Sequence, residues 1–140
     1  MSEQAVKRVI IIGAGQAGGE AALRLRQAGF GGDVTLVGEE PAPPYQRPPL
    51  SKKYLSGELS MDRLLLRPAG VYAEENVAFL APLRAVWIDR ANRRVRLEGG
   101  RELGYDALVL ATGARARKLT LVGADLAGAH LLRTSADVDA

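Results

Sequence analysis

Hydrophobic and polar residues follow one another in blocks that predict a strand–helix–strand unit at the start of the chain. The run Lys7–Ile12 is apolar and rich in β-branched residues, which predicts a buried strand. Apolar residues then recur at positions 21, 22, 25 and 28, and this spacing predicts a helix over Glu20–Ala28 that Gly29 ends. A second apolar run predicts another strand over Asp33–Gly38, so the three elements form one βαβ unit.

The pattern after this unit predicts a loop and then short strands. Five prolines between positions 40 and 50 predict an extended loop without a helix or central strand. Short helices are expected at Leu50–Leu55 and Val71–Asn76. Strands are expected at Val77–Leu80, Ala85–Asp89, Val95–Glu98 and Tyr105–Gly113, the last of them buried and running into glycine. We therefore expect an α/β fold, with a Rossmann-like βαβ unit in a parallel sheet plus an antiparallel β-meander.

Composition narrows the class of protein. The 140 residues are 47% hydrophobic and 25% charged, which are ordinary values for a globular protein. The apolar runs are far shorter than the roughly 20 residues of a membrane span, and the start of the chain does not have the pattern of a signal peptide. With no cysteine and one histidine, we expect a cytoplasmic protein without a metal site or a disulfide.

The net charge of +3 is unevenly distributed. Residues 84–118, called here the basic block, carry nine basic and four acidic side chains, a net +5. Few aromatic residues and no nucleic-acid motif accompany this block, so we expect no nucleic-acid partner. Two interpretations remain: a solvated sheet edge, or a docking surface for an acidic protein.

The first strand leads directly into the motif Gly13-x-Gly15-x-x-Gly18. Glycine at 13 permits a tight turn, glycine at 15 lets the backbone approach a pyrophosphate, and glycine at 18 lets helix and strand pack closely. The helix N-terminus then offers free amides to the phosphates. Because the motif follows a strand and opens a helix inside one βαβ unit, it predicts a dinucleotide site.

Two further features point to the type of dinucleotide. Glu39 lies just after the second strand, where a carboxylate can accept hydrogen bonds from both ribose hydroxyls and would repel a 2′-phosphate. The proline loop carries Arg47 and Lys52, and a cation near an isoalloxazine ring stabilises the reduced flavin. The alternative is a proline-rich surface linker with solvated charges. Glu40 is interpreted as a solvated neighbour of Glu39.

The chain resembles the N-terminal part of FAD-containing, NAD(P)H-dependent ferredoxin reductases of the putidaredoxin- and rhodocoxin-reductase type. The segments that carry the resemblance are spread along the chain: Val9–Gly18, Gly38-Glu39, Arg47–Lys52, Leu66–Pro68, Tyr105–Ala114 and Leu132–Thr134. The Arg-Pro-Pro-Leu-Ser-Lys run is more specific than the glycine motif. Family members are roughly three times longer, so we expect an N-terminal fragment. Residues 1–114 would belong to the FAD-binding domain, and 115–140 would lead to an NAD(P)H domain that this chain lacks.

The resemblance also implies roles for individual residues. Those expected to bind FAD are Gly13, Gly15, Gln16, Ala17, Gly18, Glu39, Arg47, Lys52, Ala85, Thr112, Gly113 and Arg133. Among them, Lys52 would lie near the reactive edge of the flavin, Ala85 would contact the adenine through its backbone, and Arg133 would reach the cofactor from the domain connection. No catalytic acid or base is expected in this segment.

The implied function is electron transfer from NAD(P)H, bound outside this chain, through FAD to an acidic [2Fe–2S] ferredoxin that serves an oxygenase. One alternative stays among flavoproteins: a rubredoxin reductase, a nitrite reductase or a relative of apoptosis-inducing factor. Another is a nucleotide-binding fragment without catalysis of its own. The sequence predicts neither the oligomeric state nor the choice between NADH and NADPH.

Overall fold

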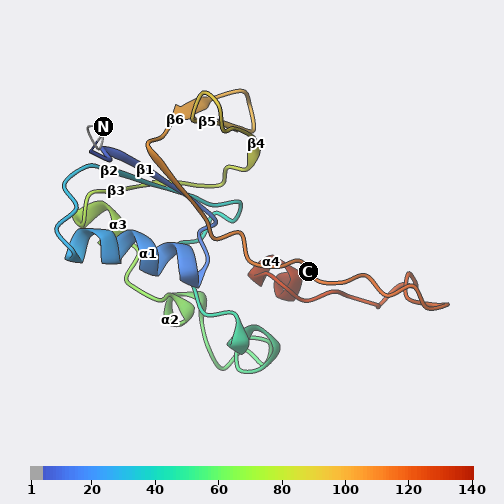
Figure 1. The fold of residues 1–140 in the computed structure, drawn as a ribbon. Coiled ribbons are helices and arrows are strands. Elements are labelled where there is room, and N and C mark those ends of the chain that lie inside the picture. Colours follow the sequence, from blue (N-terminus) through green and yellow to red (C-terminus); the bar gives the residue numbers. More distant parts are fainter. Residues whose placement is uncertain (1–4) are drawn as a thin grey trace. The chain divides into compact units, whose positions relative to one another are not determined.

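A computed structural model describes residues 5–140 and contains the predicted strand–helix–strand unit (Figure 1). Strand β1 (Arg8–Ile12) leads into helix α1 (Gln16–Gln27), and strand β2 (Asp33–Val37) follows. β1 and β2 pair in parallel. The helix begins four residues before the predicted Glu20, because the small residues at its start continue the helix directly from the glycine turn.

β1 lies inside a four-stranded parallel sheet with the order β3-β2-β1-β7. β3 (Val77–Leu80) pairs with β2, and β7 (Ala107–Leu110) pairs with β1. Helix α3 (Val71–Glu74) precedes β3, as predicted. Because all four strands run in the same direction, their carboxyl ends meet at one edge of the sheet, where α/β folds bind ligands. We call it the carboxyl edge.

Alternate side chains of β1 enter two different cores. Val9 and Ile11 pack on the face that α1 and α3 cover, whereas Ile10 and Ile12 pack on the face that the three-stranded sheet covers (Figure 1). Ile11 is fully buried, and burying a side chain of this size contributes about 1.5–3 kcal/mol. The strand that carries the glycine turn is thus held from both faces.

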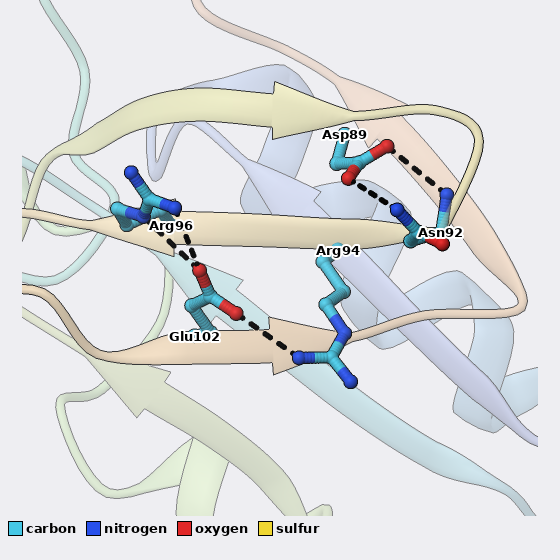
Figure 2. A network of polar contacts seen from close by, with 5 residues as sticks. All are labelled: Asp89, Asn92, Arg94, Arg96 and Glu102. Atoms are coloured by element: carbon cyan, nitrogen blue, oxygen red, sulfur yellow. Dashed lines mark hydrogen bonds and ion pairs between the residues drawn. The ribbon is translucent and has the colours of Figure 1, made fainter.

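The predicted meander is an antiparallel sheet of β4 (Ala85–Asp89), β5 (Arg94–Leu97) and β6 (Glu102–Gly104). Along β5, Val95 and Leu97 are buried while Arg94 and Arg96, which alternate with them, are exposed, as a period of two requires. Figure 2 shows the polar contacts on the outer side, with Glu102 of β6 between two arginines of β5. β6 itself was not predicted, because three residues are too few to give a pattern.

Two expectations for this fold are wrong. The segment 105–113 is not a uniformly buried strand: β7 has β1 as its neighbour on one side, and Val109 and Leu110 are 36% and 62% exposed. The proline loop also contains a helix, the 3₁₀ turn Pro48–Ser51. Prolines fit its first two positions because the amides at a helix start have no partner within the helix. The predicted helix Leu50–Leu55 is therefore displaced toward the prolines.

The chain divides into two compact units. The first holds the chain up to Tyr45 together with Arg67–Gly113, and the second holds Gln46–Leu66 and Ala114–Ala140. Besides the 3₁₀ turn, the second unit contains α2 (Met61–Leu64) and α4 (Ser135–Asp139), which were not predicted. Within residues 5–140, no helix has the length and apolar character needed to cross a bilayer.

Candidate dinucleotide-binding site

The glycine turn after β1 requires glycine at its first position. Gly13 has a φ of +109°, a conformation that side chains with a Cβ atom rarely adopt. An added Cβ atom would overlap the carbonyl oxygen of Ala111 and lie 2.9 Å from the amide nitrogen of Thr112. The amide of Gly13 donates to Val37 at 2.8 Å. The turn is therefore fixed between the ends of β2 and β7.

Gly18 and Gly15 of the motif have different surroundings, as the sequence predicts: Gly18 is closely packed and Gly15 is open. A Cβ atom at Gly18 would overlap the carbonyl oxygen of Gly13 and lie 3.3 Å from Cγ2 of Ile11, so this glycine permits α1 to pack on the turn. A Cβ atom at Gly15 would meet no atom within 4 Å. The space beside Gly15 is therefore open, which is the condition for a phosphate to approach the backbone.

The start of α1 is suited to an anion. Its N-cap residue is Gly15, and no side chain caps the helix. The first turn carries no acidic residue, and Gln16 and Ala17 within it are exposed. The amides of a helix start need acceptors, and the helix dipole favours negative charge there. These residues fit the pyrophosphate of a dinucleotide such as FAD.

Glu39 follows β2 at the same edge, and its side chain is 63% exposed. Arg84 is its partner: the guanidinium Nε lies 3.4 Å from a carboxylate oxygen of Glu39. The backbone brings the two together, because the amide of Leu83 donates to Gly38 at 2.7 Å. The sequence analysis did not identify Arg84, since 45 positions separate it from Glu39 and no local pattern joins them.

The remaining expected residues of the first unit also lie at this edge. Ala85 directly follows Arg84 and begins β4. Thr112 and Gly113 follow β7, and the contact of Thr112 with the Gly13 turn places them next to the glycine motif. The structure thus brings together the positions that were expected to hold the pyrophosphate, the ribose and the adenine. Their roles toward FAD remain predictions.

Three expected residues belong to the second unit. Nη1 of Arg47 donates to the backbone carbonyl of Arg133 at 2.8 Å, so these two positions meet although 86 residues separate them. Lys52 is exposed, and its ammonium lies 3.3 Å from the carbonyl of Pro48. The structure therefore brings Arg47 and Arg133 into contact. Lys52 can turn toward a ligand by giving up its weak hydrogen bond to Pro48.

Glu40 is not the solvated bystander that the sequence suggested. The hydroxyl of Tyr45 donates to its carboxylate, and Tyr45 is 4% exposed. A buried hydroxyl needs a partner, and removing it leaves an unsatisfied group. Glu40 is therefore part of the packing of the loop.

Some arginines of the basic block are already engaged in ion pairs within the protein. Within the meander, Arg94 and Arg96 both bind Glu102, at 3.1 and 2.9 Å. The guanidinium of Arg96 also lies 4.9 Å from the ring centre of Trp87, which is 46% exposed on the outer face. The exposed Arg115 and Arg117 lie in the second unit, and among the described contacts neither has an ion pair. Arg115 and Arg117 are therefore better suited to bind a charged partner than Arg94 and Arg96 are.

A polar groove lies at the amino end of β1, opposite to the end that leads into the glycine turn. It is lined by Arg8, Asn92, Arg93, Arg94, Glu102, Gly104, Tyr105 and Asp106. Asp106 accepts the amides of Lys7 and Arg8 at 3.0 and 2.8 Å, and these hydrogen bonds lower the pKa of its carboxyl. This carboxylate ties the start of β1 to β7. The groove is thus separated from the glycine turn by the length of the strand.

Comparison with known proteins identifies the family. The family model for pyridine nucleotide-disulphide oxidoreductases matches residues 7–140. The chain belongs to this family. Its members are oxidoreductases that use FAD and a pyridine nucleotide, so the expected fold, family and cofactor class are confirmed.

Individual relatives narrow the resemblance. Rhodocoxin reductase of Rhodococcus erythropolis is 48% identical over 131 residues, which are 94% of this chain and 31% of that protein. A rubredoxin–NAD(+) reductase of Pseudomonas putida is 41% identical, over 92% of this chain and 34% of that protein. The crystal structure of the covalent putidaredoxin reductase–putidaredoxin complex matches with a TM-score of 0.86 and 39% identity, covering 97% of this chain and 33% of the other. The chain thus spans about a third of the length of these relatives.

Proposed function

We propose that this chain is the FAD-binding segment of an oxidoreductase that transfers electrons from NAD(P)H to a [2Fe–2S] ferredoxin. The observation that carries the proposal is the open approach to Gly15 in front of the uncapped start of α1, with the exposed carboxylate of Glu39 at the same edge. This arrangement matches the pyrophosphate and ribose of one dinucleotide. The cytoplasmic location expected from the sequence belongs to the same proposal.

Each of these residues binds or orients the cofactor in this proposal. The amides after Gly15 bind the pyrophosphate, and Glu39 accepts hydrogen bonds from the ribose hydroxyls. Arg47 and Lys52 supply positive charge on the flavin side. FAD, when bound, supplies the chemistry that joins two-electron transfer from the nicotinamide to one-electron transfer to an iron–sulfur centre.

The carboxylate of Glu39 favours FAD over NADP at this site. A 2′-phosphate at the ribose would bring two negative groups together at an exposed edge, and the ion pair of Glu39 with Arg84 offsets only part of this repulsion. Extraction of the purified protein should therefore return FAD, with an absorption band at about 450 nm, as an oxidised flavin gives. Recovery of NADP, or of no nucleotide, would overturn the proposal. We assign no residue of this chain to NAD(P)H, which is the substrate.

The electron acceptor is the finer part of the proposal. An acidic ferredoxin is supported by the relative named rhodocoxin reductase and by the putidaredoxin complex, together with the exposed Arg115 and Arg117. A rubredoxin is the second candidate, because rubredoxin reductases match the same part of the chain at 40–41% identity. Steady-state reduction of each acceptor by NADH, catalysed by the full-length protein, separates the two: faster reduction of rubredoxin would replace the ferredoxin assignment. Reduction of neither acceptor by the full-length, flavin-loaded protein would reject electron transfer to small iron proteins.

A further inference from the structure

The start of α4 is organised by one carboxylate. Oδ2 of Asp137 accepts the amide of Thr134 at 2.7 Å, its hydroxyl at 2.9 Å and the amide of Arg133 at 2.8 Å. In return, the amide of Asp137 donates to the hydroxyl oxygen of Thr134, which completes a capping box. The hydrogen bonds from Thr134 and Arg133 lower the pKa of the Asp137 carboxyl, and the positive charge of Arg47 adds to the effect. The group is therefore ionised at neutral pH.

This carboxylate and Arg47 bind the two ends of one peptide group. The amide of Thr134 and the carbonyl of Arg133 belong to the same planar unit, in which N–H and C=O point in opposite directions. Asp137 binds the N–H side, and Nη1 of Arg47 donates to the C=O side at 2.8 Å. Fixing one side of a peptide plane fixes the other, and a charge on the N–H side makes the carbonyl a stronger acceptor.

We propose that Asp137 is a positioning residue for Arg47, acting through the peptide group between Arg133 and Thr134. The inference rests on the proposed function for its consequence, since Arg47 is the arginine assigned to the flavin side. The contacts that carry it lie within the second unit and connect α4 with the 3₁₀ turn that begins at Pro48. Without the carboxylate, this peptide loses its fixed orientation and the guanidinium loses a defined acceptor.

The competing role for Asp137 is purely local, as the cap of a five-residue helix. A double-mutant cycle separates the two roles. In the full-length protein, Asp137→Ala should weaken FAD binding about 10-fold, measured by quenching of flavin fluorescence. In the Arg47→Met background the same change should weaken binding less than about twofold, because the residue through which it acts is gone. An equal loss in both backgrounds, or no loss in either, would overturn the proposal.

Matched variants complete the experiment. Asp125→Ala removes an exposed carboxylate of the same unit, so it should leave FAD affinity within about twofold. Asp137→Glu keeps a reciprocal capping partner at this helix position, and it should restore most of the affinity. If Asp137→Ala fails to fold, so that it shows no thermal unfolding transition, Asp137→Glu takes its place. Failure of Asp137→Glu to restore FAD affinity would count against the positioning role.

A flavin-free readout separates this inference from the proposed function. Rotation of the Arg47 guanidinium, observed by NMR of the flavin-free protein, should become faster in Asp137→Ala and stay unchanged in Asp125→Ala. A parent protein that binds no FAD but shows this faster rotation in Asp137→Ala would reject the proposed function and support the positioning role. Unchanged guanidinium dynamics would overturn the positioning role, whatever the protein binds.

Discussion

Two glycines of the motif, Gly15 and Gly18, allow a prediction that separates folding from cofactor binding. Gly15 has a φ of −86° and a ψ of −165°, which alanine adopts without strain, and its Cβ would meet no atom within 4 Å. Alanine reduces the entropy of the unfolded chain but is a poorer N-cap than glycine, and these effects oppose each other. The Gly15→Ala variant should therefore keep its free energy of unfolding within about 1 kcal/mol of the parent.

Gly18→Ala is the matched variant with the opposite expectation. Its Cβ would overlap the carbonyl oxygen of Gly13, with the carbonyl carbon at 3.0 Å and Cγ2 of Ile11 at 3.3 Å. These neighbours are backbone atoms of the turn and a side chain of a fully buried residue, so none can move cheaply. Overpacking typically costs about 1–3 kcal/mol, and because these neighbours cannot yield we expect a loss of about 3 kcal/mol. Thermal unfolding of the flavin-free variants measures both effects.

For FAD binding we expect the opposite result: Gly15→Ala, although it folds as the parent does, should bind FAD weakly. The methyl group of Gly15→Ala occupies the space through which the pyrophosphate approaches, and it disrupts hydrogen bonds to a charged group of about 1.5–3 kcal/mol each. We expect FAD to bind at least about 30-fold more weakly, which corresponds to about 2 kcal/mol. Parent-like FAD affinity, or a thermal destabilisation as large as that of Gly18→Ala, would refute the assignment of Gly15 to the phosphate.

Three further predictions concern charged residues of the site. Glu39→Ala should weaken FAD binding by about 1–3 kcal/mol by equilibrium titration, whereas the exposed Glu98→Ala should do little; equal losses would show that the ribose carboxylate is misassigned. Lys52→Met should change the flavin potential and its rate of reduction by NADH more than FAD retention, and parent-like values would make Lys52 a solvated loop residue. Reversing Arg115 and Arg117 to Glu should slow ferredoxin reduction and flatten its salt dependence, because steering weakens as the Debye length falls from about 10 Å at 0.1 M to about 3 Å at 1 M. Reduction of a small uncharged acceptor is the control for this pair, and an unchanged ferredoxin rate would leave the two arginines as solvated surface.

The parts of the fold that the sequence predicts are those with a local physical signature. β1 and β2 are short apolar runs because both faces of the parallel sheet are covered. The turn between β1 and α1 is recognisable because backbone overlap excludes side chains at Gly13 and Gly18. β5 is recognisable because one face of the meander is buried and the other exposed. In each case a few neighbouring residues carry the whole signal.

The parts that the sequence does not predict depend on distant partners or on very short elements. α4 has five residues and no buried residue, so it gives no apolar periodicity. The Thr134-x-x-Asp137 pair was the available signal, since it follows the spacing of a capping box. The exposure of Leu110 follows from the position of β7 in the sheet, which no property of the strand reveals. The pairing of Glu39 with Arg84 likewise exists only after the chain has folded.

The contrast between tightly packed glycines and exposed charged residues suggests how related segments can belong to reductases with different electron acceptors. Relatives named for rhodocoxin and for rubredoxin share 48% and 41% identity with this same segment. Glycines that are fixed by backbone overlap cannot be exchanged without loss of stability, so the cofactor turn resists change. Exposed arginines such as Arg115 and Arg117 can be exchanged at a cost that is usually within about 0.5 kcal/mol. A change of acceptor is therefore open to the charged surface, while the carboxyl edge that would hold the dinucleotide is constrained by the packing of β1 against α1.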